Sequence, residues 1–502
     1  MKARAQFSDL TDELLLKIGS NLPHQDLRML ALASRRFRGP AQEALYNDIS
    51  VINTWEKFIR FTRTLLQCRN FLPKVRSLEI GQNTGWDEAF KKQRSASHDR
   101  EAIVSRILDS VKADTLRPDD WQDLEKWDIN TTMTVLIHLA TNLTRLDVQE
   151  RALSCFSLHD AGLSTLLSAP VFASLKHLSL SPYAELHWNW CMLPSLQTLK
   201  LGNIFLRPSI STDALSSKVR ELTLNCNGSV LLPRPDDDDD TLLTMFLRKF
   251  DRLTKFRLQL PGYAQYGYLR RTGEYFNEFA ASTAYPDSEA LWDQASFCNL
   301  YKMMASLSPT LEHLQLWVPN ERGIDQGRIY SEVPYPAPSP GLRQFACLKS
   351  VLLPQWALKY SEAIVDEARS WGSSYIQYRT EKLPASPPRI TTKLPASLQV
   401  LDMYHVNDEI IPLLQELADS RHTYFVNLKE VWLREYDDDY SWHTRIPWAA
   451  LEAADITLWF RRSVMSLGGT MGEPSLEELD ELERIELEVI WPGRPDNIPS
   501  FT

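Results

Sequence analysis

The hexapeptides LQVLDM (residues 398–403) and LKEVWL (residues 428–433) share one pattern, an apolar residue at the first, fourth and sixth positions. Successive side chains of a strand alternate between its two faces. Each hexapeptide therefore predicts a short strand whose fourth and sixth residues point inward, while the third, fifth and seventh point outward. The pattern occurs eleven times, with copies that begin at Val75, Leu143, Leu175, Leu196, Val219, Leu253, Leu311, Leu348, Leu398, Leu428 and Leu482.

Recurrence in this form predicts strands that stack in parallel, with helical or irregular segments covering the other side. The spacing is irregular, from about 20 residues between copies to nearly 70 after Val75. Long inserts between the hexapeptides account for the irregular spacing. We expect a charged helical insert at about 81–135, an aromatic-rich insert at 261–310 and a proline-rich loop at 319–347. An ordinary α/β domain with leucine-rich strands is the alternative.

The N-terminal segment predicts three short helices. Thr11 can cap the first helix, Pro23 ends it, and a second runs from about Gln25 to Ala33. The Gly39-Pro40 pair is expected to break the chain before a third helix. Such small helices cannot hide all of their large apolar side chains against one another, so some must face a partner or the next domain. The residues concerned are Leu10, Leu14, Leu15, Leu16, Ile18, Leu22, Leu27, Met29, Leu30 and Leu32.

This segment resembles an F-box, the three-helix module that binds a Skp-type adaptor of a cullin-RING ubiquitin ligase. The likeness rests on Leu10, on DELLL at 12–16, on Asp26-Leu27, on SRRF at 34–37 and on Leu45-Tyr46. Thr11 stands where the family usually has proline, Phe37 where it often has tryptophan, and Pro40 within a usual helix. The resemblance implies that the adaptor binds Leu10, Leu14, Leu15, Ile18, Leu22, Leu27, Leu30 and Phe37. The alternative is a helical cap on a larger domain.

The hexapeptides resemble leucine-rich repeats, and the typical closing asparagine is clearest at Asn227. With the N-terminal likeness, the chain is similar to fungal F-box and leucine-rich-repeat proteins. The implied α/β fold is a three-helix F-box followed by an irregular solenoid with parallel strands on its concave face. The expected organisation is an F-box at 1–50, a linker helix at 51–74, the repeat domain at 75–490 and a C-terminal tail at 491–502.

The resemblance implies the substrate-recognition subunit of a Skp-cullin-F-box ubiquitin ligase, which binds the adaptor through the F-box, cullin through the adaptor, and a protein substrate through the repeats. Such a receptor acts by proximity and needs no catalytic residue. An F-box scaffold outside degradation is an alternative, and an enzyme with a site among the inserts is another. Outward positions of the later repeats carry the residue types that dominate protein interfaces, unless inserts or the tail cover them. As substrate-binding residues we expect His313, Trp317, Tyr404, Trp432 and Arg434.

The net charge of −10 provides no basic stripe, so we expect no nucleic-acid partner. No run of about 18 apolar residues occurs, charged residues interrupt any signal sequence, and six scattered cysteines are typical of reduced thiols. We therefore expect no membrane contact and a location in the cytoplasm, the nucleus or both. The acidic runs Asp236 to Asp240 and Asp437 to Asp439 could attract a basic partner or be solvated loops.

The sequence predicts no cofactor, no metal site and no catalytic residues. GGTMGEP at 468–474 lacks the lysine and the preceding strand of a phosphate-binding loop, and neither G-x-S-x-G nor H-E-x-x-H occurs. His187 and Cys191 form one pair without the second pair that a structural zinc site needs.

Overall fold

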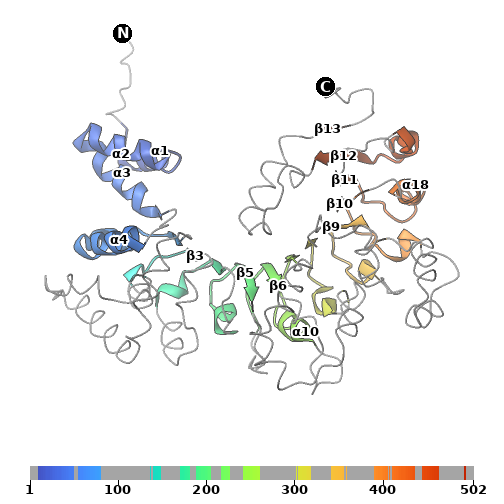
Figure 1. Ribbon diagram of the computed structural model, residues 1–502, viewed down its shortest axis with the longest axis horizontal. Helices are drawn as coiled ribbons and strands as arrows, with labels where there is room; N and C mark the ends of the chain where they lie inside the picture. The colour runs from blue at the N-terminus through green and yellow to red at the C-terminus, as the bar shows by residue number, and fades with distance from the viewer. Residues whose placement is uncertain are drawn as a thin grey trace, which may run out of the picture. The chain divides into compact units, whose positions relative to one another are not determined.

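The computed structural model describes the chain in two compact units (Figure 1). The N-terminal unit is Met1–Ile204 with Ser211–Asp213 and Ser217–Val219, and the C-terminal unit holds the remaining residues. The residues described are 10–49, 55–80, 136, 139–148, 170–180, 188–204, 216–226, 241–259, 301, 303–317, 341–355, 358, 389–404, 406, 410–435, 444–462 and 491–492. The copy of the hexapeptide at Leu482 and most of the three expected inserts lie outside them.

In the N-terminal unit, α-helices come first and short strands alternate with 3₁₀ helices afterwards. The α-helices are α1 (Asp12–Gly19), α2 (His24–Ala33), α3 (Arg35–Asn47) and α4 (Trp55–Gln67). The strands are β1 (Asp48–Ile49), β2 (Ser77–Ile80), β3 (Arg145–Val148), β4 (His177–Leu180) and β5 (Thr198–Ile204). The 3₁₀ helices are η2 (Arg69–Lys74), η5 (Pro170–Ala173) and η6 (Trp188–Met192).

In the C-terminal unit, strands again alternate with short helices. The strands are β6 (Glu221–Cys226), β7 (Lys255–Gln259), β8 (His313–Trp317), β9 (Ser350–Pro354), β10 (Val400–Tyr404), β11 (Glu430–Glu435), β12 (Thr457–Arg462) and β13 (Trp491–Pro492). The helices are α10 (Leu242–Leu247), η8 (Ala305–Leu307), η9 (Gly341–Gln344), η11 (Ile390–Thr392), α18 (Ile410–Ser420) and α19 (Trp448–Ala453).

Within each unit the strands lie side by side in chain order and pair in parallel, β1 to β5 in one and β6 to β12 in the other. β13 is the exception, because it pairs antiparallel with β12. The register aligns equivalent hexapeptide positions, as where Leu401 lies between Val351 and Val431. The predicted α/β class with a parallel sheet is therefore confirmed.

All ten described hexapeptides form strands, β2 to β11, and their apolar positions form the core. The first, fourth and sixth residues of every copy are at most 3% exposed, as in Leu398, Leu401 and Met403. The opposite side of the sheet carries the third, fifth and seventh residues, and we call it the 3-5-7 face. The hexapeptide pattern does not predict three of the strands. β1 and β13 are each only two residues long, and the residue at the first position of the repeat that contains β12 is Asp455, whose backbone is left-handed with φ 54°.

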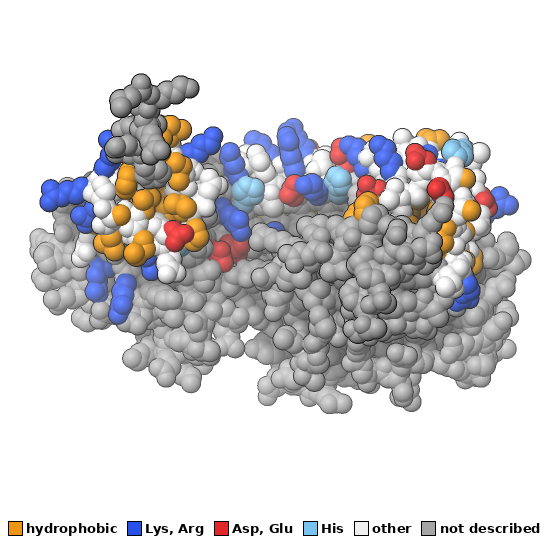
Figure 2. All heavy atoms as spheres, turned by 90° about the horizontal axis from the view of Figure 1, so that it is seen from above, with side chains coloured by type: hydrophobic (Ala, Val, Ile, Leu, Met, Phe, Trp, Pro, Cys, Tyr) orange, Lys and Arg blue, Asp and Glu red, His pale blue; other side chains and the backbone are white. Residues whose placement is uncertain are grey.

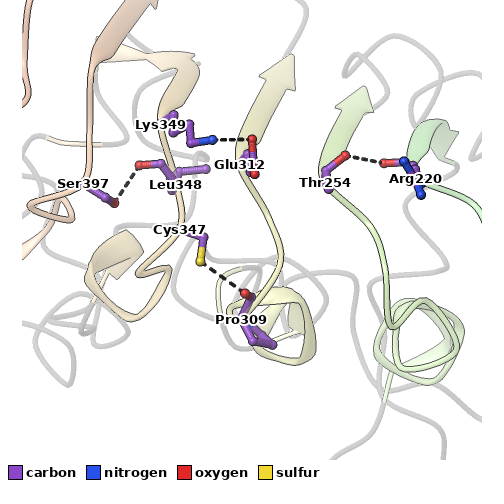
Figure 3. Close-up of polar contacts among 8 residues, drawn as sticks. All are labelled: Arg220, Thr254, Pro309, Glu312, Cys347, Leu348, Lys349 and Ser397. Atoms are coloured by element: carbon purple, nitrogen blue, oxygen red, sulfur yellow. Dashed lines mark hydrogen bonds and ion pairs between the residues drawn. The ribbon is translucent and has the colours of Figure 1, made fainter.

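A ladder of hydrogen bonds joins each repeat to the one before it. The carbonyl of the second residue accepts two backbone N–H groups from the next repeat, as Glu312 O does from Lys349 N at 2.7 Å and Ser350 N at 3.1 Å. In Figure 3, the Cys347 Sγ donates to Pro309 O at 3.2 Å and the Lys349 Nζ lies 2.7 Å from Glu312 Oε2. Each repeat therefore fixes the register of the next through main-chain carbonyls.

A polar residue directly before the first apolar residue carries much of this ladder. Asn142 Nδ2 donates to Pro73 O at 2.7 Å, Ser195 Oγ to Ala173 O at 2.6 Å, and Ser397 Oγ to Leu348 O at 2.8 Å. Each of these side chains donates to a main-chain carbonyl of the preceding repeat or of the segment before it. The hexapeptide pattern did not predict this position, because it begins one residue later.

The expected break at Gly39-Pro40 was wrong, since α3 runs unbroken from Arg35 to Asn47 with Pro40 inside it. The helix starts before Gly39-Pro40 because Ser34 caps its N-terminus. The Arg36 N–H donates to Ser34 Oγ at 3.2 Å and the Arg38 N–H to Ser34 O at 3.1 Å. Pro40 then removes one hydrogen bond near the start of a 13-residue helix. Among the described helices, none combines the length and the apolar character needed to cross a membrane.

Candidate protein-binding sites

The helices α1, α2 and α3 form one small helical module at the start of the N-terminal unit. Its core consists of Leu27, Ala41 and Ala44, with partly buried apolar side chains around them. At Gly19 an added Cβ would lie 3.1 Å from Ala44 Cβ, so α1 and α3 approach closely there. The Arg36 Nη2 donates to Leu10 O at 2.6 Å and fixes the chain as it enters α1.

Large apolar side chains gather on the outside of this module. Among the described residues five large apolar side chains are exposed, and four of them lie on α1 and α2: Leu14 at 48%, Ile18 at 36%, Met29 at 64% and Leu32 at 83%. Figure 2 shows hydrophobic side chains gathered on the helical module, at the left of that view. We call these four residues the apolar face of the module.

The eight predicted adaptor-binding residues divide between this surface and the interior. Leu14 and Ile18 are exposed, whereas Leu15 and Leu27 are each only 2% exposed and pack inside. The remaining four, Leu10, Leu22, Leu30 and Phe37, are partly buried. The sequence-based list omitted Met29 and Leu32, although helical geometry could have found them, because both lie on the side of α2 opposite Leu27.

On the 3-5-7 face of the C-terminal unit, three predicted substrate-binding residues meet. The rings of Trp317 and Tyr404 stack with centroids 5.3 Å apart and planes 24° apart. The Arg434 guanidinium lies over the Trp317 ring, with Cζ 5.2 Å from the centroid. We call Trp317, Tyr404 and Arg434 the stacked cluster.

Two anchors hold the stacked cluster in place. The Tyr404 hydroxyl donates to Leu316 O at 2.8 Å, and Tyr404 is buried. Arg434, only 3% exposed, donates from Nε to Asp402 Oδ1 at 3.0 Å and from Nη2 to Asp402 Oδ2 at 2.8 Å. This two-pronged ion pair neutralises the guanidinium charge and fixes its plane over the indole. Tyr404 and Arg434 thus serve as support for Trp317.

The other two predicted residues, Trp432 and His313, have contacts of their own. Trp432 stacks on Trp459 of β12 at 5.1 Å and 13°, and its Nε1 donates to Glu430 Oε2 at 3.0 Å. His313 is partly buried, and burial together with the nearby Lys255 lowers its pKa. At neutral pH His313 is thus a neutral hydrogen-bonding group. Trp459 was missed because the hexapeptide pattern did not detect β12.

Among the described residues on the 3-5-7 face of the N-terminal unit, Asp147 on β3 is a buried acid. Burial raises the pKa of its carboxyl, and Ser179, Arg145 and Lys200 act in the opposite direction. Arg145 Nη2 lies 3.7 Å from Asp147 Oδ2. A carboxylate held by these groups is a structural feature of the sheet.

Groups that could support metal or thiol chemistry are few in the part of the chain that the structure describes. Within it, no three His, Cys, Asp or Glu residues are placed to hold one metal ion. Cys191 is buried, and burial raises the pKa of its thiol. His187 and the two acidic runs, Asp236 to Asp240 and Asp437 to Asp439, lie outside the described residues.

No protein-family model matches this chain, and no curated protein was found to resemble it.

Proposed function

We propose that this chain is the substrate-recognition subunit of a Skp-cullin-F-box ubiquitin ligase, in the cytoplasm, the nucleus or both. The helices α1 to α3 act as an F-box that binds a Skp-type adaptor. The strands β2 to β12 act as leucine-rich repeats, whose 3-5-7 face binds the substrate. The chain supplies no catalytic group, because holding a substrate near the ligase raises the effective concentration of its lysines.

The apolar face of the module carries this proposal. Leu14, Ile18, Met29 and Leu32 gather on two short helices, while the module keeps its own core of Leu27, Ala41 and Ala44. Apolar side chains exposed together in this way are typical of a surface that another protein covers. Because this segment resembles an F-box, we propose that the protein that covers this surface is a Skp-type adaptor.

The test is co-purification of the full chain with a Skp-type adaptor. Leu14→Asp and Ile18→Asp each introduce a charge that the complex would bury without a counter-ion, so each should abolish the complex. Both side chains are exposed in the free chain, hence the variants should keep its melting temperature.

Val426→Asp is the matched control. Val426 is the fifth exposed large apolar residue of the described chain, 54% exposed, and it lies in the C-terminal unit. This variant should bind the adaptor like the wild type. Adaptor binding that survives both Leu14→Asp and Ile18→Asp would defeat the F-box assignment.

Loss of binding in all three variants would instead point to a general effect of an added charge. A reconstituted ligase then separates a receptor from a scaffold, because only a receptor leads to ubiquitylation of the protein that it holds.

A further inference from the structure

Three basic side chains lie at the amino ends of neighbouring strands in the N-terminal unit. Arg76 directly precedes β2, Arg145 is the first residue of β3, and Lys176 directly precedes β4. The main chain holds these positions together, because the Arg145 N–H donates to Arg76 O at 3.0 Å and the Lys176 N–H to Thr144 O at 2.8 Å. Parallel strands begin at the same edge of their sheet. We call Arg76, Arg145 and Lys176 the basic edge.

The basic edge is open to solvent. All three residues are exposed, and the side chain of Arg145 is 56% exposed. The Arg145 Nη2 comes no closer than 3.7 Å to Asp147 Oδ2. In the part of the chain that the structure describes, no ion pair joins Arg76 or Lys176 to an acid. An external partner can therefore reach all three charges.

The corresponding positions of the C-terminal unit are balanced in charge. The Lys255 Nζ lies 2.7 Å from Glu221 Oε1, and the Lys349 Nζ lies 2.7 Å from Glu312 Oε2. These four residues occupy the second or third positions of their repeats, whereas the repeats that contain β2 to β5 carry no acid at either position. The net charge of −10 for the whole chain thus conceals a local excess of positive charge.

The basic edge selects a partner by charge and by length. Adjacent strands of a sheet lie about 4.8 Å apart, so the basic edge spans roughly 10 Å across three strands. Side chains on one face of an extended peptide recur at every second residue, about 6.6 Å apart. Two or three carboxylates of an acidic peptide therefore fit this span. A longer polyanion such as nucleic acid would also meet the excess of acidic residues elsewhere on the chain, which repels it.

We propose that the basic edge binds an extended protein segment rich in Asp and Glu. The guanidinium groups of Arg76 and Arg145 each donate to a carboxylate, and the Lys176 ammonium adds a third positive charge. Because these groups are exposed, the attraction is screened by salt. Only the description of this segment as part of a substrate rests on the proposed function.

The test measures the affinity of the purified full chain for a labelled 12-residue peptide of alternating Glu and Ser, by fluorescence polarisation. The matched peptide has Gln in place of every Glu. At low salt the wild type should bind the Glu peptide about tenfold more tightly than the Gln peptide, because each exposed ion pair contributes about two- to fivefold. Salt at about 0.5 M should remove most of this difference.

The double variant Arg76→Gln/Lys176→Gln should weaken binding of the Glu peptide about fivefold or more. Lys255→Gln/Lys429→Gln is the matched control, because it removes two positive charges from exposed positions of the C-terminal unit. The control should bind the Glu peptide like the wild type. All four side chains are exposed, so both double variants should keep the melting temperature of the wild type.

Three results would overturn the proposal. Equal affinity of the wild type for the Glu and the Gln peptide would exclude recognition of carboxylates. Equal weakening by the two double variants would assign the attraction to the net charge of the chain. Tighter binding of a 12-nucleotide single-stranded DNA than of the Glu peptide would assign the basic edge to nucleic acid. None of these measurements involves the adaptor, so failure of the F-box assignment would leave the results unaffected.

Discussion

The guanidinium of Arg434 is held between Asp402, to which it donates two hydrogen bonds, and the ring of Trp317, over which it lies. The three side chains come from the neighbouring strand pair β10 and β11 and from β8. Because the arginine charge is already paired, Arg434 contributes orientation to this surface and not a free positive charge. Its contribution to stability can be measured.

Arg434→Met should destabilise the C-terminal unit by about 3–5 kcal/mol, because it leaves the carboxylate of Asp402, whose side chain is only 13% exposed, without its counter-ion. The double variant Arg434→Met/Asp402→Leu should recover most of that loss, since both charges are then gone. Urea unfolding followed by tryptophan fluorescence measures both. Equal losses in the single and the double variant would show that the packing of the arginine matters and the ion pair does not.

The interior and the surface of the helical module should respond differently to truncation. Leu27→Ala should lower the free energy of unfolding by about 2–5 kcal/mol, because it empties part of the module core. Leu32→Ala should change it by less than about 0.5 kcal/mol, because Leu32 is 83% exposed. Thermal unfolding of the free chain distinguishes the two. A large loss in Leu32→Ala would mean that this side chain packs against the chain itself.

Ser217, two residues before the first apolar residue Val219, makes a side-chain hydrogen bond that joins two segments of the chain in the same way as the ladder. Its buried Oγ donates to Cys191 O at 2.5 Å and accepts from the Val219 N–H at 3.3 Å. Ser217→Ala should therefore cost about 1–3 kcal/mol, since a buried carbonyl loses its donor. The neighbouring Ser216 is exposed, and Ser216→Ala is the control with no expected change. Denaturant midpoints compare the two, and similar midpoints would contradict a role for the ladder.

Asp147 predicts a pH dependence. Burial raises the pKa of its carboxyl in the folded state above the ordinary value of 3.8, so the folded chain binds this proton more readily than the unfolded chain. The charged form therefore costs stability above the raised pKa, and the cost disappears as pH falls toward the ordinary value. Asp147→Asn should melt higher than the wild type at pH 7.5, and this difference should shrink as the pH falls toward the ordinary pKa of 3.8. A difference independent of pH would contradict this prediction.

Two glycines form a matched pair for backbone effects. At Gly341 φ is +59° and an added Cβ would lie 2.7 Å from Lys393 O, whereas at Gly39 no atom lies within 4 Å of the added Cβ. Gly39→Ala should stabilise α3 by about 0.5–1 kcal/mol, because alanine loses less entropy in a helix. Gly341→Ala should destabilise by more than that, through strain and the clash. Thermal unfolding measures the melting temperature of both variants. Melting temperatures that shift in the same direction would contradict the prediction.

Much of the sheet was predictable because its signal is local. A hexapeptide with apolar residues at positions one, four and six has one face to bury, and all ten described copies do so as strands. The ladder residues and β12 were not predictable in the same way. Ser195 bonds to a carbonyl of another repeat, and before β12 the first apolar position is Asp455 with a left-handed backbone. Neither the hydrogen bond of Ser195 nor the strand β12 produces the repeating pattern of apolar residues by which the other strands were predicted.

The candidate sites were predictable only in part. Outward positions of the repeats indicated Trp317, Tyr404 and Arg434, and the structure brings these three together. Asn225 and Gln259 were overlooked, because polar amides on an outward position are unremarkable until their burial is known. The structure shows that both are buried and that Gln259 pairs in register with Asn225 and Trp317.

Residue patterns in the sequence indicate where ten of the described strands lie, which of their side chains enter the core and that the N-terminal helices have more leucines than they can bury. These properties depend on the alternation of side chains along a strand and on apolar surface area, both encoded by residues close together in the chain. The packing of helices and strands against one another establishes that Leu14 is exposed while Leu15 is buried, that Arg434 binds Asp402 and that Gln259 is buried. Those outcomes depend on which residues of other helices and strands come within a few ångströms, and that is fixed only when the elements pack.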